Sequence, residues 1–393
     1  MANYMMSRME AARAALEKAA GSAADFPGKD EARQRLALLG PKEGAPQKLS
    51  SSDLEALLKQ RPNDPVALMR LGEAYEKEGT AAKAADAYER ALKANPRLVA
   101  ATMKLAQLNA GPLKDTSKAL AYAKKARELA PSDAQVGAFL GRIAYQTGNF
   151  SWAYSLLQES ARSLADDPTT LHDFAWAAYS LGHLAEAQEA MRRVSSVAAG
   201  SSQGDDAKRF LTLTLLDQAN ADPTPAEAEI SKVLATEPQY VPALMGRAAI
   251  QLKRGDRTAA AATYTDVLRQ FPDFAPAEKR LAAIYAEQPE NVSKAYDLAN
   301  RARKVLGDDP ELSKTLGLIS YQRKEFRRAA QLLQESARRG PLDPTSLYYL
   351  GMSQFQAGQK DDGKQALNAS LQAGLQPPLA VEARRVLTDA ERH

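Results

Sequence analysis

Residues Pro65–Pro96, PVALMRLGEAYEKEGTAAKAADAYERALKANP, contain two apolar stripes that decide the fold. The first stripe has the i, i+3, i+4, i+7 spacing of an amphipathic helix and consists of Leu68, Leu71, Gly72 and Tyr75. The second stripe has the same period, is stopped by Pro96, and consists of Ala84, Tyr88 and Ala91. Small residues at Gly72 and Ala84 let two backbones approach closely. The stretch therefore predicts an antiparallel pair of helices joined by a short turn.

This spacing closely resembles the tetratricopeptide repeat, and it recurs along the chain. Matching units begin at residues 65, 99, 134, 168, 207, 241, 275, 310 and 344. The resemblance covers about residues 31–393 and about ten units. It implies an all-α fold, a right-handed superhelical solenoid of antiparallel helix pairs, in which the first helix of each unit lines a concave wall.

A longer repeat of 176 residues is superimposed on the short one. The heptapeptide LLQESAR occurs at residues 156–162 and again at residues 332–338, and the same shift maps Tyr88 onto Tyr264. We infer that a block of five units was duplicated in tandem. The expected domains are an N-terminal capping helix with a linker (1–30), a degenerate unit (31–64), a first five-unit block (65–240), a second block of four units (241–382) and a C-terminal capping helix (383–393).

The degenerate unit departs from the repeat pattern in its first helix. That helix is expected at residues 31–39, because Gly40 and Pro41 would stop it. Ser52 and Glu55 have the spacing of a capping box, in which each residue satisfies an amide of the other. The spacing predicts that the second helix of this unit begins at Ser52.

Composition excludes several classes of protein. The 393 residues contain no cysteine, so disulfide bonds and thiolate metal sites are excluded. The net charge of +4 is small for this length, and both signs occur along every expected helix, which favours a solvated surface over a nucleic-acid-binding one. Basic residues do not repeat at one wall position per unit, so we expect no nucleic-acid partner. No apolar run approaches 18 residues, so no membrane span is expected.

The N-terminal stretch MANYMMSRMEAARAALEKAA predicts an amphipathic helix and lacks the apolar core of a secretory signal. We therefore expect a cytoplasmic protein. The alternative is a periplasmic or exported protein whose signal was removed before residue 1.

The inventory of reactive groups predicts no enzyme. The three histidines are His172, His183 and His393, and none has a second histidine three or four residues away, so no metal site is expected. Neither a GxxxxGK[ST] nor a GxGxxG motif occurs, and no strand–turn–helix context supports a nucleophilic serine. We predict no catalytic residue, no cofactor and no metal ion.

The concave wall offers a better candidate site, because large side chains lie off the core stripe in two clusters that the 176-residue shift relates. Exposed aromatic side chains on such a wall suit the capture of a peptide. The first cluster comprises Phe139, Arg142, Tyr145, His172, Trp176 and Tyr179. The second comprises Tyr321, Tyr348, Tyr349, Met352 and Phe355. The alternative is that these side chains pack sideways between units.

These patterns predict a protein–protein interaction scaffold or adaptor that binds a peptide or a helical segment of a partner on its concave surface. The alternative function is a self-associating structural scaffold that organises a multiprotein assembly. The sequence does not identify the partner.

Overall fold

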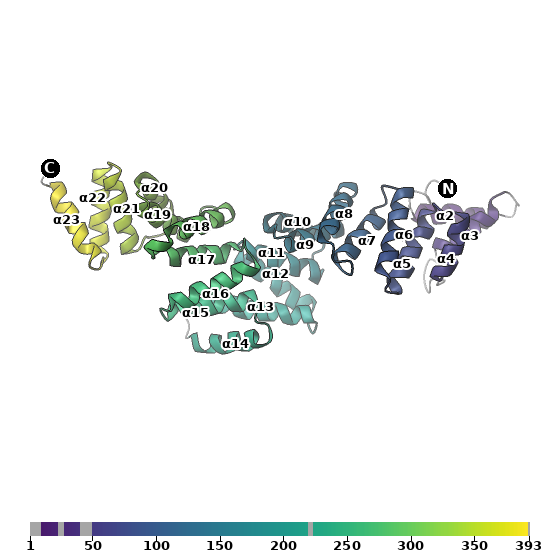
Figure 1. Cartoon of the computed structure of the whole chain (residues 1–393), viewed down its shortest axis with the longest axis horizontal. Coiled ribbons are helices and arrows are strands. Elements are labelled where there is room, and N and C mark those ends of the chain that lie inside the picture. The colour runs from purple at the N-terminus through teal and green to yellow at the C-terminus, as the bar shows by residue number, and fades with distance from the viewer. Residues whose placement is uncertain (1–8, 23–26, 40–48, 219–222, 392–393) are drawn as a thin grey trace. The chain divides into compact units, whose positions relative to one another are not determined.

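The computed structural model describes residues 9–22, 27–39, 49–218 and 223–391, and every regular element in these ranges is helical. Figure 1 labels the helices from α2 to α23. The chain divides into two compact units, Met1–Ala165 and Asp166–His393. Each unit is described by itself below. The predicted domain boundary between residues 240 and 241 was placed where one copy of the sequence block ends and the next begins, not by compactness. That boundary stays a prediction.

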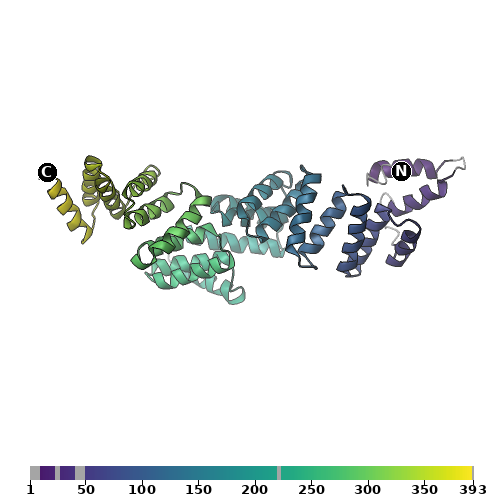
Figure 2. The same cartoon turned by 45° about the horizontal axis from the view of Figure 1, so that its top comes forward.

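The first compact unit contains a series of helix pairs. Its helices are α2 (Met9–Ala20), α3 (Lys29–Leu39), α4 (Ser51–Gln60), α5 (Pro65–Lys77), α6 (Ala81–Ala94), α7 (Val99–Ala110), α8 (Thr116–Leu129), α9 (Ala134–Gln146) and α10 (Phe150–Ser163). The closest packing is within the pairs α5–α6, α7–α8 and α9–α10. In Figures 1 and 2 the two helices of each of these pairs lie side by side.

The second compact unit continues the same pattern. Its helices are α11 (Pro168–Ser180), α12 (Leu184–Val197), α13 (Ser202–Gln218), α14 (Pro223–Thr236), α15 (Val241–Lys253), α16 (Arg257–Gln270), α17 (Ala275–Ala286), the 3-10 turn η1 (Pro289–Asn291), α18 (Val292–Leu306), α19 (Pro310–Gln322), α20 (Phe326–Ala337), α21 (Pro344–Gln356), α22 (Lys360–Gln372) and α23 (Leu379–Glu391). First helices of consecutive pairs also contact each other directly, as α17 contacts α19 and α19 contacts α21. The prediction of an all-helical array of paired helices is confirmed.

Helix starts follow the expected units closely, because most units begin with an N-cap signal. Asp167, Asp309 and Asp343 each accept a backbone N–H from the first turn of the following helix, and a proline occupies the next position. The helix expected at residue 207 begins earlier, at Ser202. There the hydroxyl of Ser201 accepts the N–H of Gly204 at 3.2 Å, which caps a helix one turn longer than expected.

The capping box of α4 is displaced by two residues from its predicted place. The Ser50 hydroxyl accepts the N–H of Asp53, and the Asp53 carboxylate accepts the N–H of Ser50. The prediction that Ser52 and Glu55 form this box is therefore wrong. Glu55 instead accepts a hydrogen bond from the hydroxyl of Tyr75 on the neighbouring helix α5.

Close contact within a pair depends on a small residue in the first helix. A methyl group on Gly72 would lie 2.4 Å from the ring of Tyr88, which is sixteen residues later in the second helix. The same holds in three other pairs. A methyl group on Gly141 would lie 2.7 Å from Leu157, one on Gly317 would lie 2.6 Å from Leu333, and one on Gly351 would lie 2.8 Å from Leu367. In each case the larger residue fills the space that the glycine leaves.

The 176-residue shift also relates contacts in the structure. Arg127 on α8 bonds Glu159 on α10 at 2.7 Å, and the shift maps this pair onto Arg303 and Glu335, which lie 2.8 Å apart on α18 and α20. Both ion pairs link the second helices of neighbouring pairs. The repetition of a specific contact supports the inference that the block was duplicated.

Within the described part of the chain, none of the helices is both long and apolar enough to cross a membrane.

Replacing Gly72 with alanine should lower the free energy of unfolding by about 1–3 kcal/mol, because the added methyl group overlaps the Tyr88 ring. Guanidinium denaturation followed by circular dichroism measures the change. Gly340→Ala is the matched control, since its methyl group would meet no heavy atom within 4 Å. Equal stability of the two variants would show that the close contact is not required.

Candidate partner-binding surface

The predicted site residues fall in three places. Phe139, Arg142 and Tyr145 lie on α9 in the first compact unit. There Phe139 packs beside a small core cluster, and the ring centre of Tyr145 lies 5.1 Å from that of Phe150. His172, Trp176 and Tyr179 lie on α11, and the remaining five residues lie on α19 and α21, all in the second compact unit.

The aromatic residues of α11 are held in a cluster with residues from later helices. The Trp176 ring meets three others nearly edge-on: Tyr179 at 6.1 Å, Phe210 on α13 at 5.6 Å and Tyr240 at 5.8 Å. Such edge-to-face contacts add to the stability that burial of the rings provides. The cluster therefore joins α11 to α13 and to the residue that precedes α15.

Tyr179 contacts a residue that is distant in the sequence. Its ring centre lies 5.3 Å from that of Phe274, which precedes α17, and its side chain is only 7% exposed. Beside it, a methyl group on Gly182 would lie 2.7 Å from Leu306 at the end of α18. The first-helix surface at α11 is thus covered by a helix pair that comes three pairs later in the chain.

A polar network borders this cluster. Asp206 Oδ2 lies 2.8 Å from His172 Nε2, Asp206 Oδ1 lies 2.7 Å from Arg209 Nη2, and Arg209 Nη1 lies 2.6 Å from Glu237. Burial tends to raise the pKa of Asp206, but the hydrogen bonds from His172 and Arg209 outweigh it and lower that pKa. Because a carboxylate only accepts, the Nε2 atom of His172 carries the proton. It therefore cannot also accept from Trp176 Nε1 at 3.3 Å.

The C-terminal cluster is buried at its centre and open at its edge. Tyr348 is 4% exposed and Met352 is 5% exposed. Tyr349 contacts Tyr348 at 5.2 Å and Tyr321 at 5.0 Å between ring centres. Tyr321, Tyr349 and Phe355 keep part of their surface in water.

These positions correct one expectation about exposure. Tyr179, Tyr348 and Met352 do not face solvent on an open wall, because they pack between helix pairs. Helical periodicity placed these residues off the core stripe of their own pair, but it could not show that other helix pairs cover them. For the partly exposed residues a role in partner binding stays a prediction; these are Phe139, Arg142, Tyr145, His172, Trp176, Tyr321, Tyr349 and Phe355.

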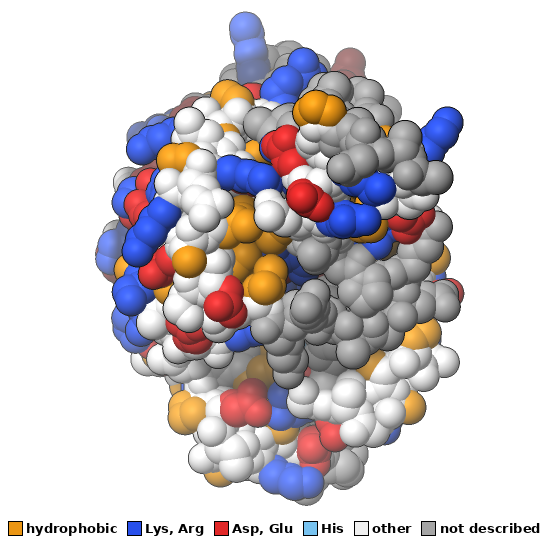
Figure 3. All heavy atoms as spheres, turned by 90° about the vertical axis from the view of Figure 1, so that its right-hand side faces the viewer, with side chains coloured by type: hydrophobic (Ala, Val, Ile, Leu, Met, Phe, Trp, Pro, Cys, Tyr) orange, Lys and Arg blue, Asp and Glu red, His pale blue; other side chains and the backbone are white. Residues whose placement is uncertain are grey.

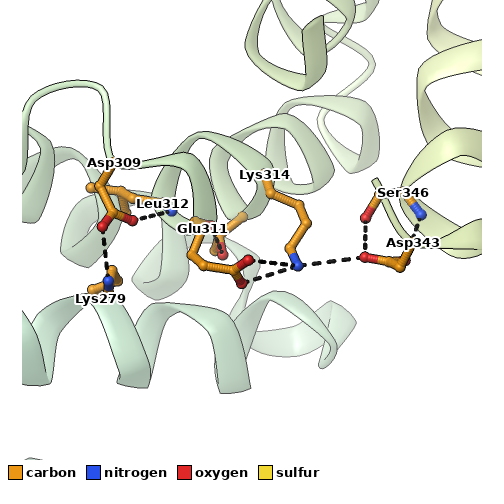
Figure 4. A network of polar contacts seen from close by, with 8 residues as sticks. Lys279, Asp309, Glu311, Leu312, Lys314, Asp343 and Ser346 are labelled. Atoms are coloured by element: carbon orange, nitrogen blue, oxygen red, sulfur yellow. Dashed lines mark hydrogen bonds and ion pairs between the residues drawn. The ribbon is translucent and has the colours of Figure 1, made fainter. Parts of the chain in front are cut away.

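A row of lysine–carboxylate pairs on the first helices was not predicted from the sequence. Figure 4 shows Lys279 of α17 bonded to Asp309, the N-cap of α19, at 3.0 Å. Lys314 of α19 likewise reaches Asp343, the N-cap of α21, at 3.4 Å, and it also bonds Glu311. The signal is a lysine at the position after the first core residue, followed one unit later by an N-cap aspartate. Each lysine thus links consecutive pairs and already has a carboxylate partner.

An open pocket of ≈ 620 Å³ between α4, α5 and α6 was also missed. Tyr75 lines it, and the hydrogen bond from the Tyr75 hydroxyl to Glu55 raises the pKa of Tyr75 to about 12. Lys83 Nζ lies 5.4 Å from the centre of the Tyr75 ring. The remaining rim carries charges of both signs. On the face that Figure 3 shows, basic and acidic side chains are similarly interspersed.

Over the residues that the structure describes, no group of three or more histidine, aspartate or glutamate side chains is arranged to hold a metal ion.

Family models described as tetratricopeptide repeat match residues 50–99, 242–273 and 314–378. This chain is a tetratricopeptide repeat protein. Such arrays generally act as protein-interaction scaffolds and are typically not catalytic, and this chain has their architecture.

Solved structures with similar folds are distant in sequence. A chain in the crystal structure of the APC/C hetero-tetramer Cut9–Hcn1 is 14% identical to this chain. The match covers 99% of this chain and 92% of that chain, with a TM-score of 0.47. YrrB, described as a TPR protein with an unusual peptide-binding site, is 16% identical over 50% of this chain and 99% of its own, with a TM-score of 0.42. MamA is 16% identical over 47% of this chain and 99% of its own, with a TM-score of 0.35. No curated protein matches the chain.

A carboxylate on helix α17 occupies a core position. Glu278 of α17 stands where the unit at residue 65 has Leu68, and it is 1% exposed. Burial raises the pKa of Glu278 to about 7, although Arg301 opposes this shift with its Nε atom 2.7 Å from Oε1. The 176-residue shift places Thr102 at the matching position of the first block, where the hydroxyl bonds the carbonyl of Leu98.

Tyr348→Ala should destabilise the array by about 3–5 kcal/mol, because it removes a large buried ring and leaves a cavity. Guanidinium denaturation measures this loss, and Tyr122→Ala, at a partly exposed tyrosine of α8, serves as the control. If Tyr348→Ala unfolds at the same denaturant concentration as the native chain, the ring does not pack as described.

Glu278→Gln should make stability less dependent on pH. A folded-state pKa raised from 4.5 to about 7 means that the native state binds a proton more tightly than the unfolded state does. This group therefore favours folding below pH 4.5 and loses its contribution as the pH rises to about 7. Thermal unfolding at pH 5 and pH 8 tests this: relative to the native chain, the variant should gain stability at pH 8. An unchanged difference at both values would contradict the shift.

Proposed function

We propose that this tetratricopeptide repeat protein is a scaffold that binds a peptide or helical segment of a partner protein on the first-helix surface of α19 and α21. The observation that supports this choice is the partial exposure of four apolar residues on that surface. They are Leu318, Tyr321, Tyr349 and Phe355. We call this set the C-terminal surface.

The contrast between the two blocks favours this surface over its counterpart. At α11 the matching surface is covered from within the chain, because Tyr179 contacts Phe274 and Gly182 approaches Leu306. Phe355 stands at the position of Tyr179 in the second block, and it remains partly exposed. Within the described part of the chain nothing like Phe274 covers Phe355, so a partner can reach this position.

The chemistry of the C-terminal surface suits a segment that is amphipathic. Tyr321 and Tyr349 offer rigid rings with hydroxyl groups, so they can contact apolar and polar groups of a ligand at low entropic cost. The Lys314–Asp343 pair lies on the same row of first helices and gives the surface a polar border. Specificity would come from this combination of an apolar centre and a charged edge.

Site-specific photocrosslinking in cells that express the chain naturally tests the proposal. A photoreactive amino acid at Leu318 should form an adduct with a partner protein, because this residue lies on the C-terminal surface. The control position is Arg327, which is exposed on the second helix α20. Mass spectrometry of the adduct identifies the crosslinked chain.

The outcomes separate the two candidate functions. An adduct with a different protein at residue 318 but not at residue 327 supports the scaffold function. An adduct with a second copy of this chain supports the self-associating scaffold instead. Equal adducts at both positions would contradict a specific surface.

A further inference from the structure

The start of helix α17 packs on the surface of an earlier first helix of the same chain, α11. Phe274 is the residue before the first turn of α17, and it is 1% exposed. The Phe274 ring packs against Tyr179 of α11. Pro276, two residues later, lies beside Gly182: its Cγ atom is 3.9 Å from the position that a methyl group on Gly182 would take. The segment therefore combines an aromatic N-cap residue with a proline in the first turn of a helix.

The second block repeats the residues of α11 and α13 that surround this contact. The 176-residue shift maps Tyr179 onto Phe355, Gly182 onto Gly358 and Phe210 onto Val386. The helices match as well, since α11 begins at Pro168 and α21 begins at Pro344. The two turn glycines share the left-handed conformation that glycine favours, with φ values of 77° and 89°.

Among the described residues nothing fills the repeated position, whereas the original is filled. A methyl group on Gly182 would lie 2.7 Å from Leu306, but one on Gly358 would meet no heavy atom within 4 Å. Tyr179 contacts the rings of Phe210 and Phe274, yet among the described residues no aromatic ring packs against Phe355. Val386 stands where the first block has Phe210, so this position offers Phe355 no ring.

We propose that the surface around Phe355 and Gly358 binds a partner helix whose N-cap residue is aromatic and whose first turn contains proline. This assignment rests on the proposed scaffold function and names the chemistry of the bound segment. The aromatic ring would pack against Phe355, and the start of the helix would lie over the turn at Gly358. The internal contact of Phe274 with Tyr179 is the template for this arrangement.

A peptide with the chain's own residues 270–287, QFPDFAPAEKRLAAIYAE, is the probe, because it carries the template segment. With a fluorescent label, it is titrated with the full chain and followed by anisotropy. We expect saturable binding that weakens at least about tenfold when the peptide carries Phe274→Ala or the protein carries Phe355→Ala, as for other central aromatic contacts. Trp152→Ala is the control, since this partly exposed ring lies on the second helix α10 and should not affect binding.

A second variant separates binding from folding. Phe355→Leu keeps an apolar side chain of similar size but removes the ring, and circular dichroism verifies that each variant retains its helicity. Peptide affinity that is unchanged by both Phe355 variants, or by Phe274→Ala in the peptide, would overturn the proposal. If the peptide fails to bind while residue 318 still crosslinks to a partner, the ligand chemistry assigned here is wrong and the scaffold function stands.

Discussion

The structure depends on the close approach of the two helices within each pair. That approach requires glycine or alanine in the first helix opposite a large residue sixteen positions later. Gly72 and Tyr88 form such a pair, and Ala248 and Tyr264 have the same spacing. A pair packed in this way still exposes an apolar stripe on each side, so it must stack on further pairs to bury it. The stacked array of helix pairs follows from this constraint.

Most of the fold could be predicted from the sequence because these local contacts recur at fixed spacing. Helix α17 begins at Ala275 and α19 at Pro310, as the unit pattern predicts, since proline and aspartate signals mark many starts. Helix α13 begins earlier than expected because Ser201 supplies a cap outside the repeat pattern. The duplication could also be predicted, and the matched Arg127–Glu159 and Arg303–Glu335 ion pairs agree with it.

The candidate site was harder to predict, because exposure depends on segments that are distant in the sequence. The helical period places Tyr179 off the core stripe of its own pair, but Phe274 of a later pair covers it. Tyr348 is likewise buried by its neighbours in the last pairs, whereas Phe355 remains partly exposed. Periodicity thus separates the core stripe of a pair from the residues beside it, but contacts with other pairs decide which of those residues stay accessible. Glu278 stands at the core position that Leu68 occupies in its own unit, so the helical period itself places this carboxylate inside.

One block used twice therefore produces two different surfaces. In the first copy an aromatic contact between α11 and the start of α17 closes the surface, and in the second the same position stays open. Hydroxyl-radical footprinting of the unmodified chain tests this difference most directly, with oxidation of each residue normalised to the urea-unfolded chain. Tyr179 and Phe274 should be protected while Phe355 is oxidised several-fold faster. Equal protection of all three residues would contradict an open second surface.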